Sequence, residues 1–526
     1  IDIEAPRAGI YDRSMQALAE TVDAAKIVAD PTDAHDDATK IAVVLHKRLG
    51  VDYIDTVALL RKTSTEYVEL ARHVQPERAA AVVSLLHARK FAGVYTAKDT
   101  LRVYPSDDVA ANLVGFLTDD GIGAAGIESA FDETLAGKDG SATFEMADGQ
   151  QLPLADSTIV APKEGTGIKL TIDQDLQFLA QRRLAQAVRE SGGTSGYAVI
   201  MDVKTGQLLA LADTPTFNPN QRKLSAPENY GSRALQDVFE PGSVEKVLTF
   251  AALIDAGYVT PQTKITVPSV LPRAGATIHD YFVHPTLRLT AAGVVAKSSN
   301  IGTVRAAQRM PSAEMDRYLR SFGLGSKTGA GLDGESAGLL PRASTWRPLN
   351  RDTISFGQGL SVNAVQMTAG IAAVANGGVY VQPSLIEGYV DSTGGVTAAS
   401  APERHRVVSQ KTASLVARMM EAVTGPEGTA PTANINGYRV AGKTGTAQRV
   451  DSSCACYDGS LTVSFGGFAP ADEPRFVVYV AVQEPNGGSG GGTTGGPVFH
   501  DLMAAALQKF GVPPTGQRQP ALPLTW

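Results

Sequence analysis

The chain has 526 residues, of which 43% are hydrophobic and 19% are charged. This composition is typical of a folded protein and excludes a disordered chain, and the length predicts at least two domains because single cores rarely exceed about 300 residues. The net charge of −7 and the lack of a long basic run argue against a nucleic-acid partner, and no run of 18 apolar residues suited to a membrane span occurs.

The region before residue 165 is predicted to alternate short strands and helices. Its helical patterns are amphipathic, and the first ends at Gly50, a residue suited to the left-handed turn after a helix. The predicted helices cover residues 36–50, 55–62 and 76–90. Because no titratable residues in this region have a spacing typical of catalysis, we expect its role to be structural.

The rest of the chain is predicted to form an α+β domain after a linker at 161–167. Two apolar strands joined by a Lys-Thr-Gly turn at 204–206 predict an antiparallel hairpin, and a helical region is expected from Ser243 to about Met310. Strands near both ends of the domain would share one sheet, with helices between them. The remaining predicted segments are strands at 168–173, 438–448, 461–470 and 474–484, helices at 174–191 and 497–511, and an extended tail at 512–526.

The chain has two cysteines, Cys454 and Cys456, with one residue between them. Such a short ring strains a disulfide, and two thiols are only half of a structural zinc site. The spacing therefore favours two loop thiols, with a strained local disulfide as the second interpretation. No metal and no cofactor are predicted.

The run FEPGSVEKV, residues 239–247, places Ser243 three residues before Lys246 at the start of an apolar, helix-like stretch. A serine in this position is commonly only a helix cap, and a lysine one turn later commonly lies in solvent. Residues i and i+3 share one helix face, however, so a neutral lysine there can take the serine proton and activate a nucleophile. Amide groups at the helix start can hold an oxyanion.

An acyl-transfer site of this kind needs two further elements, S-x-N and K-T-G. Ser298-Ser299-Asn300 fits the first element and ends a helical run, where side chains can point into a cleft. Residues 443–445, Lys-Thr-Gly, fit the second and follow an apolar strand. A cation and hydroxyl groups along a strand edge can line a cleft, and a small Gly445 lets substrate approach closely.

Each element has a second match in the chain. Residues 361–363, Ser-Val-Asn, also fit S-x-N, but there Ser361 is expected to cap a helix. Residues 327–329, Lys-Thr-Gly, also fit K-T-G, but they lie in a glycine-rich stretch with no strand around them. Any single motif is more commonly structural than catalytic, whereas the ordered set favours an acyl-transfer site.

With these motifs the chain resembles the class B penicillin-binding proteins, which are monofunctional peptidoglycan D,D-transpeptidases, and the division branch more than the elongation branch. The resemblance covers nearly the whole chain. It rests on PRAGIYDRSMQALA, GAAGIESAFDETLAGKDG, LTIDQDLQFLAQRRL, DVKTGQLLALADTPTFNPN, FEPGSVEKV, SSN, GQGLSVNAVQM, GKTGTAQ and FGGFAPADEPRFVV. It implies a pedestal (dimerisation-type) domain at 1–165, a transpeptidase domain at 166–513 with helices on both sides of an antiparallel sheet, and a tail at 514–526.

The resemblance implies a catalytic role for four residues. Ser243 would attack the carbonyl group of the penultimate D-Ala of a stem peptide, with Lys246 as the general base. Ser298 would relay the proton to the leaving group, and Asn300 would orient the substrate. The acidic Glu245 within the motif is expected to face away from the cleft.

The resemblance also implies the substrate-binding groups. Lys443 would bind the substrate carboxylate and help to keep Lys246 neutral by its positive charge. Thr444 and Thr446 would hydrogen-bond the same carboxylate, next to Gly445. The backbone N–H groups of Ser243 and Thr446 would form the oxyanion hole.

The implied partners are a stem peptide ending in D-Ala-D-Ala, β-lactam antibiotics, a membrane glycan polymerase and other division proteins. Because the chain begins at Ile1 rather than Met, we expect a preceding segment, which the resemblance identifies as a single-pass membrane anchor with the catalytic domain outside the cytoplasm. A D,D-carboxypeptidase or β-lactamase, in which water replaces the acceptor amine, is one alternative. A non-enzymatic β-lactam sensor or scaffold is the other.

Overall fold

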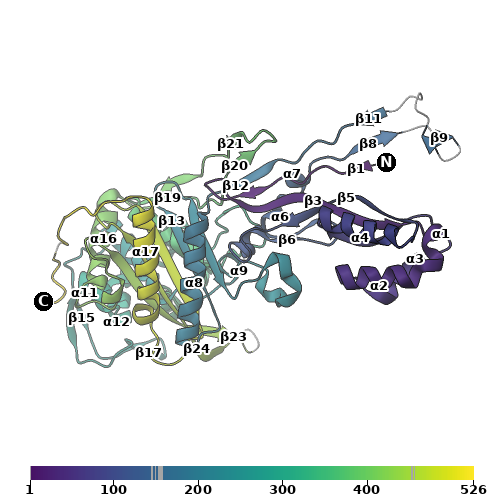
Figure 1. The fold of residues 1–526 in the computed structure, drawn as a ribbon. Helices are drawn as coiled ribbons and strands as arrows, with labels where there is room; N and C mark the ends of the chain where they lie inside the picture. The colour runs from purple at the N-terminus through teal and green to yellow at the C-terminus, as the bar shows by residue number, and fades with distance from the viewer. Residues whose placement is uncertain are drawn as a thin grey trace. The chain divides into compact units, whose positions relative to one another are not determined.

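The computed structural model describes residues 2–143, 146–147, 150–151, 158–451, 454, 456–519 and 521–526 (Figure 1). It divides into two compact units. The first unit contains Ile1–Ile10, Ala19–Pro105 and Glu133–Gly167, and the second contains Tyr11–Leu18, Ser106–Asp132 and Ile168–Trp526. The boundary at 165 stays a prediction, and residues 11–18 and 106–132, which the sequence analysis assigned to the first domain, are grouped with the second unit. Within the described residues, no helix has both the length and the apolar composition that a membrane span needs.

The core of the first unit forms between an antiparallel sheet and three helices. Apolar residues from both layers pack together, among them Ile27, Ile41 and Leu86. The strands are β3 (Ala17–Ala29), β4 (Val68–Val74) and β5 (Val94–Val103), and the helices are α2 (Ala38–Leu49), α3 (Tyr53–Leu60) and α4 (Pro76–Ala88). The predicted helices are thus confirmed, and Gly50 ends α2 in the left-handed conformation, at φ 76°.

The second unit is built on a five-stranded antiparallel sheet in the order β14-β13-β25-β24-β23. Its strands are β13 (Ser195–Asp202), β14 (Leu208–Thr214), β23 (Ala441–Asp451), β24 (Cys456–Ala469) and β25 (Phe476–Gln483). The predicted hairpin and the three predicted late strands are confirmed. Strand β23, which carries Lys443, therefore lies at one edge of the sheet.

Helices cover both faces of this sheet. Helices α8 (Gln174–Ser191) and α17 (Gly496–Lys509) lie side by side (Figure 1), and α15 (Ala364–Ala375) also packs on the sheet. A Cβ on Gly466 would lie 2.5 Å from Ile371 of α15, whereas a Cβ on Gly467 would lie 3.2 Å from Phe499 of α17. Because neighbouring strand residues point to opposite faces, α15 and α17 cover opposite sides, as predicted.

The prediction of one helical region from Ser243 to Met310 is wrong. Helices α10 (Lys246–Asp255), α11 (Ala291–Lys297) and α12 (Asn300–Ala307) are present, but four short strands lie between α10 and α11. The strands are β15 (Lys264–Val267), β16 (Leu271–Arg273), β17 (Ala276–Ile278) and β18 (Leu287–Thr290). A two-residue turn at Ala274 and Gly275, both with positive φ, joins β16 to β17, which is the geometry that tight hairpins favour.

Candidate active site

Ser243 lies in a short 3-10 turn, Gly242–Val244, directly before α10. Its side chain is half-buried, and neither this turn nor α10 has a side-chain cap at its start. Gly242 has a φ of 53°, and a Cβ there would lie 2.9 Å from the carbonyl oxygen of Thr446 on β23. The backbone around Ser243 is therefore packed tightly against the sheet edge.

Lys246 begins α10 and is completely buried. Its Nζ donates hydrogen bonds to the carbonyl oxygen of Ser298 (2.7 Å) and to Oδ1 of Asn300 (2.8 Å). No hydrogen bond joins Ser243 to Lys246 in the described part of the chain, although the sequence analysis expected the two groups to meet. A neutral amine has two N–H donors and one lone pair, so these two acceptors leave the lone pair free to receive a proton.

Ser298 occupies the corner between α11 and α12 in a left-handed conformation, with a φ of 59°. This conformation is uncommon for residues other than glycine and persists only where the surrounding structure enforces it. Its hydroxyl accepts a hydrogen bond from Lys443 Nζ at 2.8 Å, while its carbonyl accepts from Lys246. Ser298 therefore connects the two lysines.

Lys443 is also completely buried, on the edge strand β23. Its Nζ donates to the carbonyl oxygen of Thr444 at 2.9 Å as well as to Ser298, and Thr444 Oγ1 lies 2.9 Å from the hydroxyl of Thr429. Thr446, further along the strand, is exposed. Sequence reasoning missed Thr429, because nothing in its neighbourhood predicts a contact with β23.

The protonation of both lysines is shifted by their surroundings. Burial lowers the pKa of Lys246 to about 7, although the negative charges of Asp280 and Glu245 oppose the shift. The sequence analysis assigned this shift to Lys443, but burial of Lys246 itself is the main cause. Burial, and after it the charge of Lys246, lower the pKa of Lys443 well below its usual value.

Gly445 and Glu245, two neighbours of the site, both pack against this chain's own residues. A Cβ on Gly445 would lie 2.3 Å from Ser464 Oγ and 2.9 Å from Val244, so this chain's own residues, rather than substrate, occupy the space beside the glycine. Glu245, expected only to face away from the cleft, is fully buried and accepts a hydrogen bond from Thr249 (2.7 Å). Burial raises the pKa of Glu245 well above its ordinary value.

The second matches to the motifs lie apart from this network. Lys327 is exposed, in a segment with no strand or helix. Asn363 caps α15 by accepting from the N–H of Gln366, so Asn363 and not the predicted Ser361 is the cap. Ser361 instead forms a backbone bridge with Leu339.

The favoured prediction of two loop thiols is wrong, and the second interpretation holds, because the structure joins Cys454 and Cys456 in a disulfide. Their Cα atoms are 5.2 Å apart, within the range that a disulfide spans. The next residue, Tyr457, donates its hydroxyl to Glu240 (3.0 Å), three residues before Ser243. Burial and the charge of Glu240 raise the pKa of Tyr457 to about 12.

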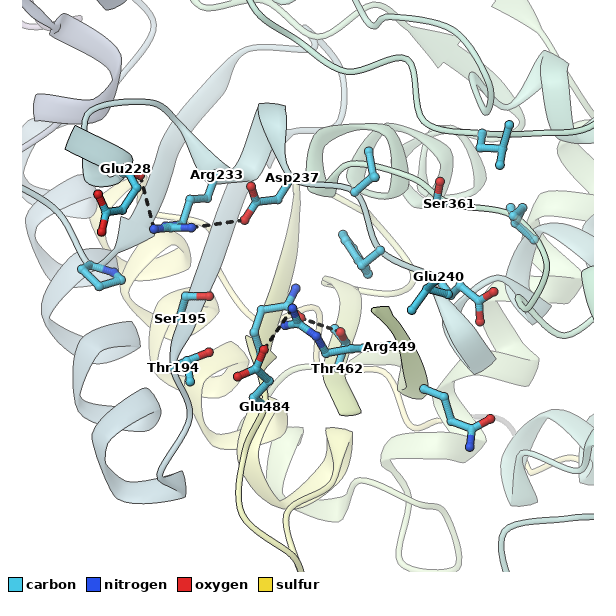
Figure 2. Close-up of a pocket in the computed structure, with 18 of the residues that line it drawn as sticks. Thr194, Ser195, Glu228, Arg233, Asp237, Glu240, Ser361, Arg449, Thr462 and Glu484 are labelled. Atoms are coloured by element: carbon cyan, nitrogen blue, oxygen red, sulfur yellow. Dashed lines mark hydrogen bonds and ion pairs between the residues drawn. The ribbon is translucent and has the colours of Figure 1, made fainter. Parts of the chain in front are cut away.

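A cavity of about 880 Å³ lies in the same unit and includes Glu240 and Gln448, which are close in sequence to Ser243 and Thr446 (Figure 2). Figure 2 shows two ion pairs on its wall, Arg233 with Asp237 (3.6 Å) and Arg449 with Glu484 (3.0 Å). Its charged lining residues are Glu228, Arg233, Asp237, Glu240, Arg449 and Glu484. Among the described residues, no group of three or more His, Cys, Asp or Glu side chains is placed to hold a metal ion.

Comparisons with known proteins agree with this arrangement. The model of the penicillin-binding protein transpeptidase domain matches residues 196–504, and the model of the penicillin-binding protein dimerisation domain matches residues 2–170. The chain is 36% identical to penicillin-binding protein PbpB of Mycobacterium tuberculosis, over 99% of this chain and 80% of that protein. It is 34% identical to the peptidoglycan D,D-transpeptidase FtsI of Escherichia coli, over 97% of this chain and 85% of that protein.

A solved structure, penicillin-binding protein 3 of Mycobacterium tuberculosis complexed with aztreonam, superimposes with a TM-score of 0.78 at 33% identity and covers both chains completely. The matched domain models account for most of the sequence, and the relatives match it nearly end to end. The chain therefore belongs to the class B penicillin-binding proteins, in the group that includes FtsI and PbpB.

Proposed function

We propose that this protein is a peptidoglycan D,D-transpeptidase that cross-links stem peptides during cell division through an acyl-enzyme on Ser243. The observation that carries the proposal is the buried network in which Lys246, Ser298, Asn300 and Lys443 converge beside the Ser243 turn. These four residues come from three separate motifs, and burying two lysine side chains carries a desolvation cost that a purely structural network would avoid.

In the first half-reaction, Ser243 Oγ attacks the carbonyl carbon of the penultimate D-Ala, and Lys246 takes the hydroxyl proton. The backbone N–H groups of Ser243 and Thr446 hold the oxyanion. The peptide C–N bond then breaks, the proton reaches the leaving amine through Ser298, and the terminal D-Ala departs. Ser243 is left as an ester of the stem peptide.

In the second half-reaction, the amine of another stem peptide attacks the ester carbonyl. Lys246 accepts a proton from that amine, the C–O bond to Ser243 breaks, and the serine recovers its proton. The product is a new peptide bond between two stem peptides. A pKa of about 7 suits Lys246 to this alternation, because the amine both gains and loses a proton near neutral pH.

Lys443, with the hydroxyl groups of Thr444 and Thr446, is assigned to the terminal carboxylate of the substrate. Burial disfavours the ammonium form of Lys443, and an entering carboxylate offsets that cost by pairing with it. Penicillins carry a carboxylate beside a reactive amide and would acylate Ser243 in the same way. The structure of penicillin-binding protein 3 of Mycobacterium tuberculosis complexed with ampicillin supports β-lactam binding.

The cellular setting is proposed from the family. A membrane anchor before the chain would hold the catalytic unit outside the cytoplasm, where a membrane glycan polymerase and other division proteins would work with it. The FtsI and PbpB relatives support the division role.

The function is tested by incubating the protein with a stem pentapeptide ending in D-Ala-D-Ala and a stem peptide with a free acceptor amine. We expect release of D-Ala together with a cross-linked dimer, both detected by mass spectrometry. D-Ala release with only a shortened tetrapeptide would identify a carboxypeptidase. Failure of the same preparation to react with either peptide or penicillin would favour a sensor or scaffold.

Of the three Lys-Thr-Gly sequences in the chain, those at 327–329 and 443–445 give a matched pair of variants. Lys443→Ala should slow acylation by carboxylate-bearing β-lactams roughly 10- to 100-fold, the range expected for one charge-assisted hydrogen bond. Lys327→Ala should react at the wild-type rate, because Lys327 is exposed and outside the network. Rates of labelling by a fluorescent penicillin measure both, and equal losses would show that β23 does not bind the carboxylate.

A further inference from the structure

The loop between β17 and β18 brings a buried carboxylate to the Ser298-Ser299-Asn300 segment. The Asp280 side chain is completely buried. It accepts hydrogen bonds from the hydroxyl of Ser299 (2.6 Å) and from the N–H of Ile301 (3.0 Å). Ser299 in turn accepts from the N–H of Gly302 (2.8 Å), so the start of α12 is tied to Asp280 through both side chain and backbone.

The same loop fixes the orientation of the Asn300 amide. Its Nδ2 donates to the carbonyl oxygen of His279 (3.0 Å), which leaves Oδ1 to accept from Lys246 Nζ (2.8 Å). Were the amide reversed, an N–H group would face the lysine and could not accept its hydrogen bond. The carbonyl oxygen of His279, the residue before Asp280, therefore decides whether Lys246 has an acceptor on this side.

Asp280 is held by a buried histidine four residues later. Nε2 of His284 lies 3.0 Å from Asp280 Oδ2, and Nδ1 lies 2.6 Å from the carbonyl oxygen of Pro285. Both partners are acceptors, and a neutral imidazole has only one N–H. When the ring carries both protons it satisfies both contacts, and it then forms an ion pair with Asp280.

The charge of Asp280 acts on the proposed base. Asp280 and Glu245 oppose the effect of burial on the pKa of Lys246, and the charge of Lys246 lowers the pKa of Lys443 on β23, after the larger effect of burial. On its own loop, Asp280 also raises the pKa of Tyr281, after the larger effect of burial. Because burial raises the pKa of Glu245 and favours its neutral form, Asp280 is the main carboxylate that favours the ammonium form of Lys246.

We propose that Asp280 and His284 are positioning residues for the reaction: they orient Asn300 and Ser298 around Lys246 and set the balance of charge beside it. The inference rests on the proposed role of Lys246 as the base. No residue of this pair touches the substrate in the proposed mechanism, so the pair acts through Lys246 and not as a catalytic group.

The test is the pH profile of the second-order rate constant for acylation by a penicillin, from pH 5 to 9. In the wild type the rate should rise with pH, because only neutral Lys246 accepts the proton, with a midpoint near its pKa of about 7. In Asp280→Asn a charge that favours the ammonium is gone, so neutral lysine persists at lower pH. The midpoint should fall by about one pH unit, the low end for a nearby opposite charge.

Asp280→Asn is compatible with the fold, because a neutral His284 can donate to Pro285 and accept from the new amide. His284→Gln provides the opposite change: the glutamine can still donate to Asp280, but the carboxylate loses its positive partner, so the midpoint should rise. The matched control is Asp202→Asn, which removes an ion-paired, buried carboxylate from β13, a strand separated from β23 by β25 and β24. Its midpoint should equal that of the wild type, and melting temperatures confirm that each variant is folded.

Opposite shifts in the two loop variants support the proposal. An unchanged midpoint in Asp280→Asn, with or without a uniform loss of rate, would overturn it and leave the pair a structural support. Shifts in the same direction in both variants would also overturn it. A wild-type protein that is not acylated at any pH would instead refute the proposed function.

Discussion

Replacement of Ser243 by alanine should abolish covalent labelling by a fluorescent penicillin. The nucleophile is lost, and no other hydroxyl lies in the 3-10 turn before α10. Stability should stay near the wild-type value, because Ser243 is half-buried and forms no side-chain cap. Gel fluorescence and a thermal melt together measure both effects.

The melting temperature of Ser243→Ala distinguishes a nucleophilic Ser243 from a Ser243 that only caps a helix. If Ser243 were only a helix cap, its replacement would lower the free energy of unfolding by about 1 kcal/mol and would not alter labelling. Retained labelling with a lowered melting temperature would therefore identify a cap. Labelling that disappears while the melting temperature holds would identify a nucleophile.

Replacement of Lys246 by alanine should slow labelling by about 10²- to 10⁴-fold, the usual contribution of a positioned general base. The serine remains, but its proton has no acceptor. Because Ser243 and Lys246 act as one unit, the variant that lacks both should lose no more labelling than Ser243→Ala alone. Stopped-flow acylation rates with a chromogenic β-lactam provide the measurement.

Lys297→Ala is the matched control for this lysine. Lys297 directly precedes Ser298 in sequence, but its Nζ donates to the carbonyl oxygen of Glu427 (2.8 Å) rather than to the network. We expect its acylation rate to match the wild type. A Lys246→Ala protein that acylates as fast as Lys297→Ala would require another base.

Much of the fold could be predicted because its signals are local. The 174–191 helix, the 196–212 hairpin and the late strands have strong periodicity or clear turns, and the structure contains all of them. The segment 264–290 could not be predicted in the same way. Its strands are only three or four residues long, which is too short for periodicity to appear, and β15 finds its partner β18 beyond an intervening hairpin.

The same distinction between local and long-range signals applies to the site. The sequence predicted a strand around Lys443 and none around Lys327, and the structure has both as predicted; the functional choice between the two lysines stays a prediction. Contacts between distant segments could not be read from spacing: Lys443 meets Ser298 across 145 positions, and Tyr457 meets Glu240 across 217. Asp280 and His284 were missed for this reason. Their spacing of four residues is the one local signal that could have indicated a contact between the two side chains.

The most direct test of the central claim is mass spectrometry of the intact wild-type protein after exposure to benzylpenicillin, followed by digestion. The account predicts one added penicilloyl group per chain, on the peptide that contains Ser243. The adduct should persist, because an acyl-enzyme awaiting an amine is hydrolysed slowly. An adduct on a peptide that lacks Ser243, or a protein that never gains the mass, would contradict the account.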